Sequence, residues 1–351
     1  MFISRFLTKA AAFMTILFLT LGSVQPAYAA PSNDNFAAAT RIMALPFNGS
    51  ADSTGATGET GEPTDCLTSF PPKTVWFAYT PSTNTTLTAV LNYPTIAGIY
   101  TGNSVDTLGL YGCAPWYYGQ FSFIAKAGVT YYFQLSDYFG NDGTLPFRLG
   151  VAPPPDVGIS YNPGDPSSYD NVSFYASISD PAGIDGNTYA WTISDGTTSN
   201  QQQFDHQFAA DGDYPVSLTF TTFDGRSNSA NTVVQVRTRD IAINKLSVPQ
   251  SARVNQTKAI NVDVTNKRYS DYVQVTLYKG LPGGGEQQIG TLTIFVPARA
   301  TRPTTFKFSY TFTSQDAQIK KVTFRAEADL TNGRDALPSD NVAIATTLVS
   351  K

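Results

Sequence analysis

The sequence predicts an all-β protein made of three consecutive antiparallel β-sandwich domains that follow a signal peptide. Aromatic residues make up 13% of the chain and charged residues 14%, and the charged share is well below the roughly 25% of a typical globular protein. Apolar residues recur with a period of two, as they do in half-buried strands of antiparallel sheets. The clearest alternating runs are Leu87, Ala89, Leu91; Val216, Leu218, Phe220; Ile260, Val262, Val264; and Phe306, Phe308, Tyr310, Phe312.

The N-terminal residues have the features of a secretory signal peptide. A basic start precedes an apolar run at 10–21, and an Ala-Tyr-Ala sequence at 27–29 forms a small-residue cleavage site. An apolar run of this length is too short to span a bilayer. We therefore assign residues 1–29 to a signal peptide and predict a secreted mature chain that starts at Ala30 and has no membrane span.

Two changes along the sequence divide the mature chain into three domains. Three consecutive prolines at 153–155 lack backbone donors, so no strand can run through them. The second boundary lies near residue 239, where one strand-like run of alternating apolar residues ends and another begins. The predicted domains are 30–152, 153–239 and 240–351. Acidic residues outnumber basic ones in the first two domains, whereas basic residues outnumber acidic ones in the third.

Turn-forming clusters separate the predicted strands. Glycine and Asn or Asp residues mark them at 140–143, 195–196 and 283–285. We expect no helix beyond a single turn at 35–40. Short strands at this spacing indicate one sandwich in each domain.

The mature chain contains two cysteines, Cys66 and Cys113. Export to an oxidising compartment favours a disulfide between them. A metal site would require more Cys or His ligands nearby, and a catalytic thiol would require a histidine as its base. We therefore predict that the two cysteines are bonded.

The middle domain contains three motifs, at 191–197, 206–218 and 223–225, and the first of them reads Trp-Thr-Ile-Ser-Asp-Gly-Thr. With these motifs the domain resembles the PKD domain over roughly residues 154–237. The usual first motif of that family is Trp-Asp-Phe-Gly-Asp-Gly, so Thr192 and Ser194 depart from it and the turn differs in detail. The resemblance implies an Ig-like sandwich that acts as a spacer or binding module in extracellular proteins.

The first domain contains a series of short motifs whose order and spacing are characteristic, at 33–37, 55–63, 75–77, 99–102 and 127–132. In these motifs the domain is similar to the bacterial pre-peptidase C-terminal domain. That similarity implies a non-catalytic sandwich whose relatives bind collagen or polysaccharide, some of them with calcium.

The third domain contains two strand-like motifs, at 240–243 and 260–266, and a turn-rich motif at 335–341. In these motifs the domain is similar to the CARDB group of Ig-like, adhesion-related bacterial domains. The resemblance implies a further Ig-like or jelly-roll-like sandwich.

Oxygen-bearing side chains gather in two stretches of the first domain. Asn33, Asp34 and Asn35 form one stretch, and Glu59 and Glu62 belong to the other. Such oxygens are the hard donors that calcium requires, and both stretches recur together in the family that this domain resembles. We predict that these five residues bind calcium. The alternative is that Asn33 and Asp34 cap a short helical turn and that the glutamates are solvated loop charges.

Three consecutive aromatic residues, Trp116, Tyr117 and Tyr118, follow Cys113 closely. In an extended stretch alternate side chains point to opposite faces, so at least one of these rings is exposed. We predict that they form a binding face for a sugar ring or a peptide. The alternative is a loop plug that covers the end of the sandwich.

Residues for catalysis are scarce. His206 is the single histidine, whereas a zinc enzyme normally uses two or more. A Ser-His-Asp arrangement would need it as a base, but the PKD pattern places it in a strand. No segment resembles a hydrolase domain that would use paired carboxylates. We therefore predict that the protein is not an enzyme.

These observations predict a non-catalytic extracellular adhesion or matrix-binding protein, whose partner is a polysaccharide, a protein polymer or a cell surface. A nucleic-acid partner is not expected. One alternative is a structural subunit of a surface layer or filament, which self-associates through its acidic and basic domains. Another is an accessory binding module of a secreted hydrolase system.

Overall fold

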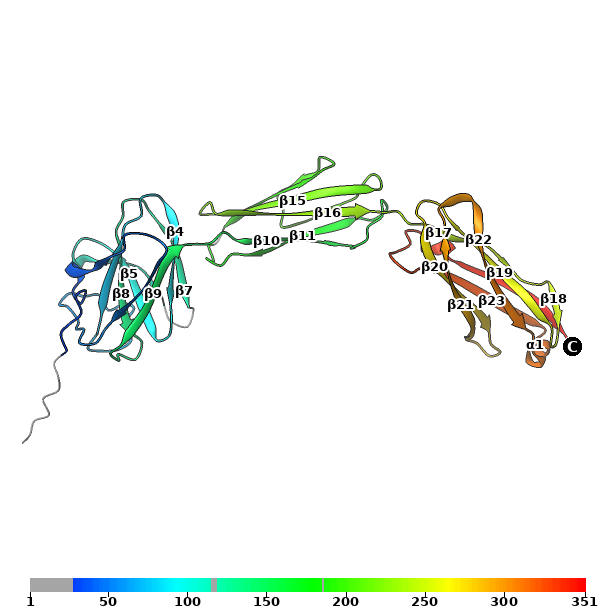
Figure 1. Ribbon diagram of the computed structural model, residues 1–351, viewed down its shortest axis with the longest axis horizontal. Helices are drawn as coiled ribbons and strands as arrows, with labels where there is room; N and C mark the ends of the chain where they lie inside the picture. Colours follow the sequence, from blue (N-terminus) through cyan, green and yellow to red (C-terminus); the bar gives the residue numbers. More distant parts are fainter. Residues whose placement is uncertain (1–27, 115–118, 185) are drawn as a thin grey trace, which may run out of the picture. The chain divides into compact units, whose positions relative to one another are not determined.

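A computed structural model describes residues 28–114, 119–184 and 186–351 (Figure 1). Over these residues the strands form six sheets, and the predicted all-β sandwich fold is confirmed. The predicted signal peptide lies almost entirely outside them. None of the helices within these ranges is long and apolar enough to cross a membrane.

The first sandwich belongs to a compact unit that ends at Val151. Its elements are η1 (Phe36–Ala38), β1 (Thr40–Arg41), β2 (Phe47–Asp52), β3 (Val75–Tyr79), β4 (Thr85–Leu91), β5 (Thr95–Thr101), η2 (Val105–Thr107), β6 (Gly109–Ala114), β7 (Gln120–Ala125), β8 (Tyr131–Asp137) and β9 (Thr144–Val151). One sheet has the order β1-β3-β8-β5-β6 and the other β2-β9-β4-β7. Their strands pair antiparallel, apart from the two-residue parallel pairing of β1 with β3.

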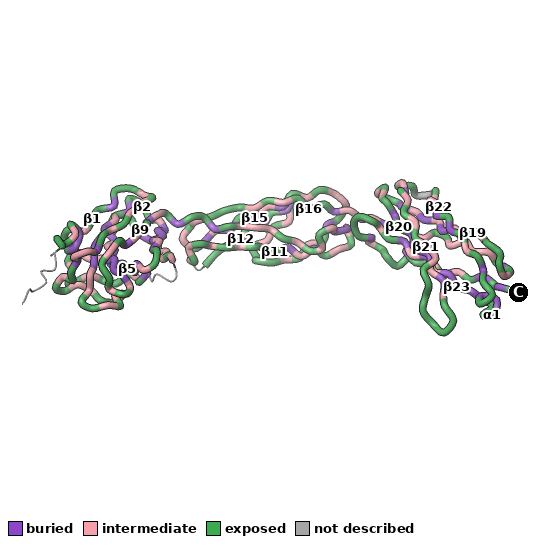
Figure 2. The backbone as a smooth tube through the Cα atoms, turned by 60° about the horizontal axis from the view of Figure 1, so that its bottom comes forward, coloured by how far each residue is buried: buried purple, intermediate pink, exposed green. Residues whose placement is uncertain are grey.

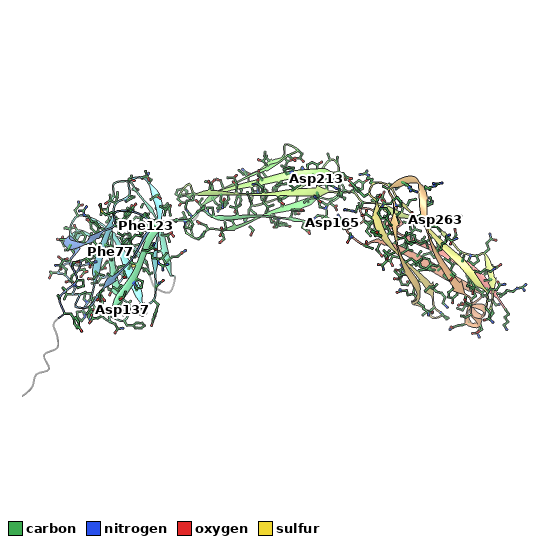
Figure 3. The ribbon with its side chains drawn as sticks, viewed as in Figure 1. Phe77, Phe123, Asp137, Asp165, Asp213 and Asp263 are labelled. Carbon is green, nitrogen blue, oxygen red and sulfur yellow. A yellow bond between two sulfur atoms is a disulfide. The ribbon has the colours of Figure 1, made fainter. Side chains whose placement is uncertain are left out.

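Alternating side chains fill the space between these two sheets. On β9, Leu145, Phe147 and Leu149 are buried, whereas Arg148 is exposed. Phe77 of the facing sheet packs on Phe147, with ring centroids 5.3 Å apart, and Figure 3 shows Phe77 inside the sandwich. Along the strands, buried residues alternate with exposed and half-buried ones (Figure 2). The period of two therefore sets which residues form the core.

The predicted disulfide between Cys66 and Cys113 is confirmed. Their Cα atoms lie 5.5 Å apart, at a sequence separation of 47. Cys113 is on the edge strand β6, and Cys66 is in the long β2–β3 loop. The bond therefore fixes this loop to the edge of the sheet.

The middle sandwich lies in a second compact unit, which starts at Ala152. Its strands are β10 (Asp156–Asn162), β11 (Val172–Ser179), β12 (Asn187–Ile193), β13 (Thr198–Ser199), β14 (Gln203–His206), β15 (Gly212–Thr222) and β16 (Ser227–Val236). The sheet orders are β10-β11-β14 and β13-β12-β15-β16. Trp191 is fully buried in the core, and its indole N–H donates to the backbone oxygen of Gln201 at 2.9 Å.

The last sandwich is part of the same compact unit and has its own core. Its elements are β17 (Ile241–Ser247), β18 (Ser251–Arg253), β19 (Thr257–Asn266), β20 (Asp271–Gly280), β21 (Glu286–Val296), β22 (Arg299–Thr311), α1 (Ser314–Ile319), β23 (Lys321–Leu330), η4 (Pro338–Asp340) and β24 (Val342–Ser350). The sheet orders are β17-β19-β22 and β18-β24-β23-β20-β21. The boundaries predicted after residues 152 and 239 stay predictions.

The helical elements confirm one expectation and correct another. The turn expected at 35–40 is present as η1. The expectation of no other helix is wrong, because α1 follows β22. Thr313 caps α1: its hydroxyl accepts from the backbone of Asp316 at 3.3 Å, and the Asp316 carboxylate accepts from the backbone of Thr313 at 2.8 Å. With six residues, α1 is too short to show a helical period in the sequence.

Asp316 also closes a buried polar cluster with Lys279 and Tyr310. The Lys279 Nζ lies 3.0 Å from the Asp316 Oδ1, and the two side chains are 6% and 0% exposed. Lys279 donates to the Tyr310 hydroxyl at 2.8 Å, and this hydroxyl donates to Asp316 at 2.8 Å. Each charged group in the cluster therefore has a partner, as burial requires.

Candidate functional site

Three of the predicted calcium ligands lie in the N-terminal segment of the first sandwich. The Asn33 amide donates to the backbone oxygen of Trp76 at 3.0 Å. The Asp34 carboxylate accepts from the backbone N–H of Thr57 at 2.7 Å and from its hydroxyl at 2.9 Å. Asn35 is the N-cap residue of η1 and makes no side-chain cap hydrogen bond. The alternative that Asn33 and Asp34 cap this turn is therefore wrong.

The other two predicted ligands, Glu59 and Glu62, lie in the β2–β3 loop. Glu59 accepts from the backbone of Phe36 at 3.0 Å, and this bond joins the loop to the N-terminal segment. The Glu62 Oε2 accepts from the backbone of Glu59 at 2.8 Å. Glu62 is therefore not a solvated loop charge. Three donors contact its Oε1: the Thr74 hydroxyl, the Trp76 indole N–H at 3.1 Å and the Gln134 amide at 3.0 Å.

Hydrogen bonds thus join both stretches, but they turn the carboxylate oxygens toward N–H and O–H donors. A calcium ion needs the same lone pairs, so this arrangement fits the ion only if hydrogen bonds are exchanged for metal bonds. In the part of the chain that the structure describes, no three His, Cys, Asp or Glu side chains form a group that could hold a metal ion. Calcium binding stays a prediction.

The predicted binding face, Trp116, Tyr117 and Tyr118, lies outside the described residues, so it too stays a prediction. His206 ends strand β14, in agreement with its strand assignment. Its Nε2 lies 2.7 Å from the Asp195 carboxylate, and its ring packs edge-on against Phe208.

The His206–Asp195 contact shows no arrangement for nucleophilic catalysis. Burial acts to raise the pKa of Asp195, but hydrogen bonds from Thr197 and His206 outweigh it and lower this pKa. Among the described residues, no serine, threonine or cysteine side chain hydrogen-bonds the His206 ring. The pair connects β14 to the turn after β12, which is a structural contact.

A group of aromatic side chains that the sequence analysis did not single out lies at one end of the first sandwich. We name Phe70, Tyr93, Tyr138 and Phe139 the aromatic loop cluster. Phe70, Tyr93 and Phe139 are 65%, 61% and 55% exposed. The Phe139 ring makes edge contacts with the rings of Tyr93 and Tyr138, with centroids 6.0 and 5.0 Å apart. Exposed aromatic rings that contact one another are typical of sites that bind other molecules.

Hydrogen bonds hold the loops of this cluster together. The Thr68 hydroxyl donates to the backbone oxygen of Tyr138 at 2.5 Å, and the Tyr138 N–H donates to the backbone oxygen of Pro94 at 2.9 Å. Asp137, at the end of the sandwich in Figure 3, accepts from the backbone of Phe139 at 2.8 Å. These bonds join the backbones of the three loops that carry the rings, β2–β3, β4–β5 and β8–β9. Preorganised groups lose less entropy on binding.

A local signal for this cluster is present in the sequence. Phe70 and Tyr93 each precede a proline, and the pair at 138–139 directly precedes the turn at 140–143. Aromatic residues beside turn-forming residues lie where strands end and cannot be covered by a facing sheet. The run of three aromatics at 116–118 is the more conspicuous signal, whereas the rings of the cluster are far apart in the chain.

Comparison with known families gives one match. Residues 154–237 match the PKD domain, so the resemblance of the middle domain is confirmed. This is an Ig-like module, in agreement with the two sheets around Trp191. Among curated proteins, no sequence matches the chain.

Several solved structures are similar to parts of this chain. The CARDB domain of a Pyrococcus furiosus protein in complex with di-metal ions is 17% identical, with 32% of this chain and 90% of that one covered and a TM-score of 0.27. Carbohydrate-binding modules of the β-sandwich superfamily are 13% identical (56% and 95% covered, TM-score 0.24). A tetra-tandem repeat from the extending region of a large adhesion protein is 13% identical (79% and 75% covered, TM-score 0.27). Likenesses at this level do not say what this chain binds.

Proposed function

We propose that the protein is a non-catalytic extracellular protein that binds a matrix polymer or a cell surface, and that the aromatic loop cluster of the first sandwich is its contact face. The observation that carries this proposal is the exposure of Phe70, Tyr93 and Phe139 on loops that hydrogen bonds join. Aromatic faces stack on sugar rings and on peptide side chains. Such rings supply much of the binding energy when they are held rigidly.

The rest of the chain supports a binding role. Residues 154–237 match the PKD domain, and the strands form successive sandwiches with separate cores. Three predictions from the sequence belong to the proposal: secretion, calcium at residues 33–35 with Glu59 and Glu62, and a second aromatic face at 116–118. The resemblance of the first domain to the pre-peptidase C-terminal domain points the same way.

A sedimentation assay with the mature chain, residues 30–351, tests the proposal. Insoluble polysaccharides and collagen fibrils serve as baits, each with and without a calcium chelator. We expect saturable binding to one bait, and roughly tenfold weaker binding for each of Tyr93→Ala and Phe139→Ala, because each removes an aromatic anchor worth about 1–2 kcal/mol. Phe223→Ala is the matched control, since Phe223 is a 77% exposed ring in the middle sandwich. Equal binding of all four proteins would reject the cluster as the contact face.

The charge pattern favours one second candidate, a structural subunit that self-associates. The first two domains are acidic and the third is basic, so copies could attract one another head to tail. Sedimentation without bait that depends on protein concentration and disappears at high salt would support this candidate. Co-purification with a secreted hydrolase would instead support an accessory binding module.

A further inference from the structure

A cleft lies at the end of the first sandwich opposite the aromatic loop cluster. It has a volume of about 580 Å³, within the range of sites for small molecules. The register fixes its position: Tyr79 and Thr101 pair with Tyr131 at this end of the five-stranded sheet, whereas Thr95 pairs with Asp137 at the end that carries the cluster. The cleft is therefore a separate site.

The walls of the cleft combine aromatic and hydroxyl groups. The rings of Phe36 and Tyr132 lie 4.5 Å apart, and Tyr132 is half-buried, so part of its ring is open to a ligand. The hydroxyls of Thr80 and Thr130 are 2.8 Å apart on the rim. The exposed amide of Asn103 also lines it. A sugar presents the complementary surface, since its ring has apolar C–H faces and a hydroxyl edge.

Arg41 is the charged residue of this lining. It ends the short strand β1 and is exposed, and no ion pair or side-chain hydrogen bond joins it to another residue within the described ranges. The five donors of a guanidinium form a planar fork that matches a carboxylate. The cleft therefore offers one site for a planar anion beside an aromatic wall.

We infer that this cleft binds a uronate unit of an extracellular polysaccharide. The carboxylate pairs with Arg41, the C–H face of the sugar packs on Tyr132, and hydroxyls bond Thr130 and Asn103. The inference rests on the proposed polymer-binding function and names the chemical class of one polymer unit. Because the first domain is acidic overall, a polymer with a carboxylate on each unit would be repelled. The cleft suits a single uronate among neutral sugars.

Ligand-observed NMR titration of the mature chain tests the inference with two probes, methyl β-D-glucuronide and methyl β-D-glucoside. They differ in whether C6 is a carboxylate or an alcohol. We expect the glucuronide to bind at least tenfold more tightly than the glucoside. Arg41→Ala should remove this preference, and Arg41→Lys should weaken it, because an ammonium lacks the planar fork. Arg148→Ala is the matched control: Arg148 is also exposed in the first sandwich, but on the other sheet.

Equal binding of the two probes, or no binding of the glucuronide, would overturn the inference. An equal loss of glucuronide affinity in Arg41→Ala and Arg148→Ala would also overturn the inference. Such a result would show that the net charge of the domain, and not the position of Arg41, determines the affinity. Failure of the proposed function is a different result. In that case Tyr93→Ala and Phe139→Ala leave sedimentation with every bait unchanged. This outcome does not depend on the affinities that the NMR titration gives for the two methyl glycosides.

Discussion

Replacement of Lys279 by methionine should destabilise the last sandwich strongly. Methionine keeps most of the side-chain volume but removes the charge, so the fully buried Asp316 carboxylate loses its cation. Its hydrogen bonds from the Tyr310 hydroxyl and the Thr313 backbone would remain. Removal of one partner from a buried pair costs about 3–5 kcal/mol. We expect the free energy of unfolding of this sandwich to fall by about that amount at neutral pH.

Hydrogen–deuterium exchange in increasing urea is the suitable assay. The three tryptophans are at 76, 116 and 191, so tryptophan fluorescence would not report on the last sandwich. Peptides from β20 and β23 measure the effect, and peptides from β12 and β15 of the middle sandwich serve as an internal control. Lys267→Met is the matched variant, because Lys267 pairs with Asp240 at 3.1 Å but is 53% exposed. Its loss should cost less than about 1 kcal/mol.

The effect of Lys279→Met should depend on pH. Burial acts to raise the pKa of Asp316, but hydrogen bonds from Thr313, Lys279 and Tyr310 outweigh it and lower this pKa. Burial acts to lower the pKa of Lys279, but Tyr310 and Asp316 outweigh it and raise this pKa. The lowered carboxylate pKa gives stability that is present above the ordinary value of about 3.9 and is lost as the pH falls further. The raised lysine pKa gives stability that is present below about 10.4 and is lost as the pH rises through the raised value.

The stability difference between the natural protein and Lys279→Met should therefore be constant near neutral pH and shrink in acid. The double variant Lys279→Met with Asp316→Asn should recover much of the loss, because it leaves no buried charge. A loss below about 1 kcal/mol at neutral pH would refute this reasoning. So would a loss that stays the same in acid, because it would come from packing rather than from charge.

Three further predictions follow from the described contacts. Cys66→Ser with Cys113→Ser should destabilise the first sandwich by about 4 kcal/mol on the chain-entropy estimate, and hydrogen exchange in increasing urea should show the loss in peptides from β3 and β8. Thr313→Ala should cost about 1 kcal/mol through the lost cap of α1, measured by hydrogen exchange in the peptides that follow it. If the calcium prediction holds, millimolar CaCl₂ should raise the midpoint of thermal unfolding and Glu62→Gln should abolish the rise; an unchanged midpoint in the natural protein would reject it.

The strands could be predicted because their signal is local. Ile260, Val262 and Val264 alternate with half-buried polar residues, and all three are fully buried in the structure. The same pattern is incomplete on β4, where Thr86 and Thr88 are buried together with the apolar residues that flank them. Contacts on both faces of a strand depend on distant segments, so period alone cannot assign them.

The candidate site could not be predicted in the same way, because its parts meet only after folding. Glu62 is a loop carboxylate in the sequence, but Trp76 and Gln134 donate to it from two neighbouring strands. Likewise the ring contact of Tyr93 with Phe139 joins loops that are far apart in the chain. Composition indicated that exposed aromatic side chains exist, but only the register of β5 with β8 brings these particular rings together.

The same register decides how the two sites of the first sandwich can cooperate. Strand β8 spans Tyr131–Asp137, about 20 Å at roughly 3.3 Å per residue, with the cleft at one end and the aromatic loop cluster at the other. Substitutions this far apart should act additively on small ligands. A single polysaccharide chain that reached both sites would instead gain avidity, so its affinity would exceed that of either site alone and would fall when either Arg41 or Tyr93 is replaced by alanine. If Arg41→Ala weakened glucuronide binding but left the polymer affinity that depends on Tyr93 unchanged, each site would hold a separate chain, and the sandwich would cross-link polymer chains rather than following one.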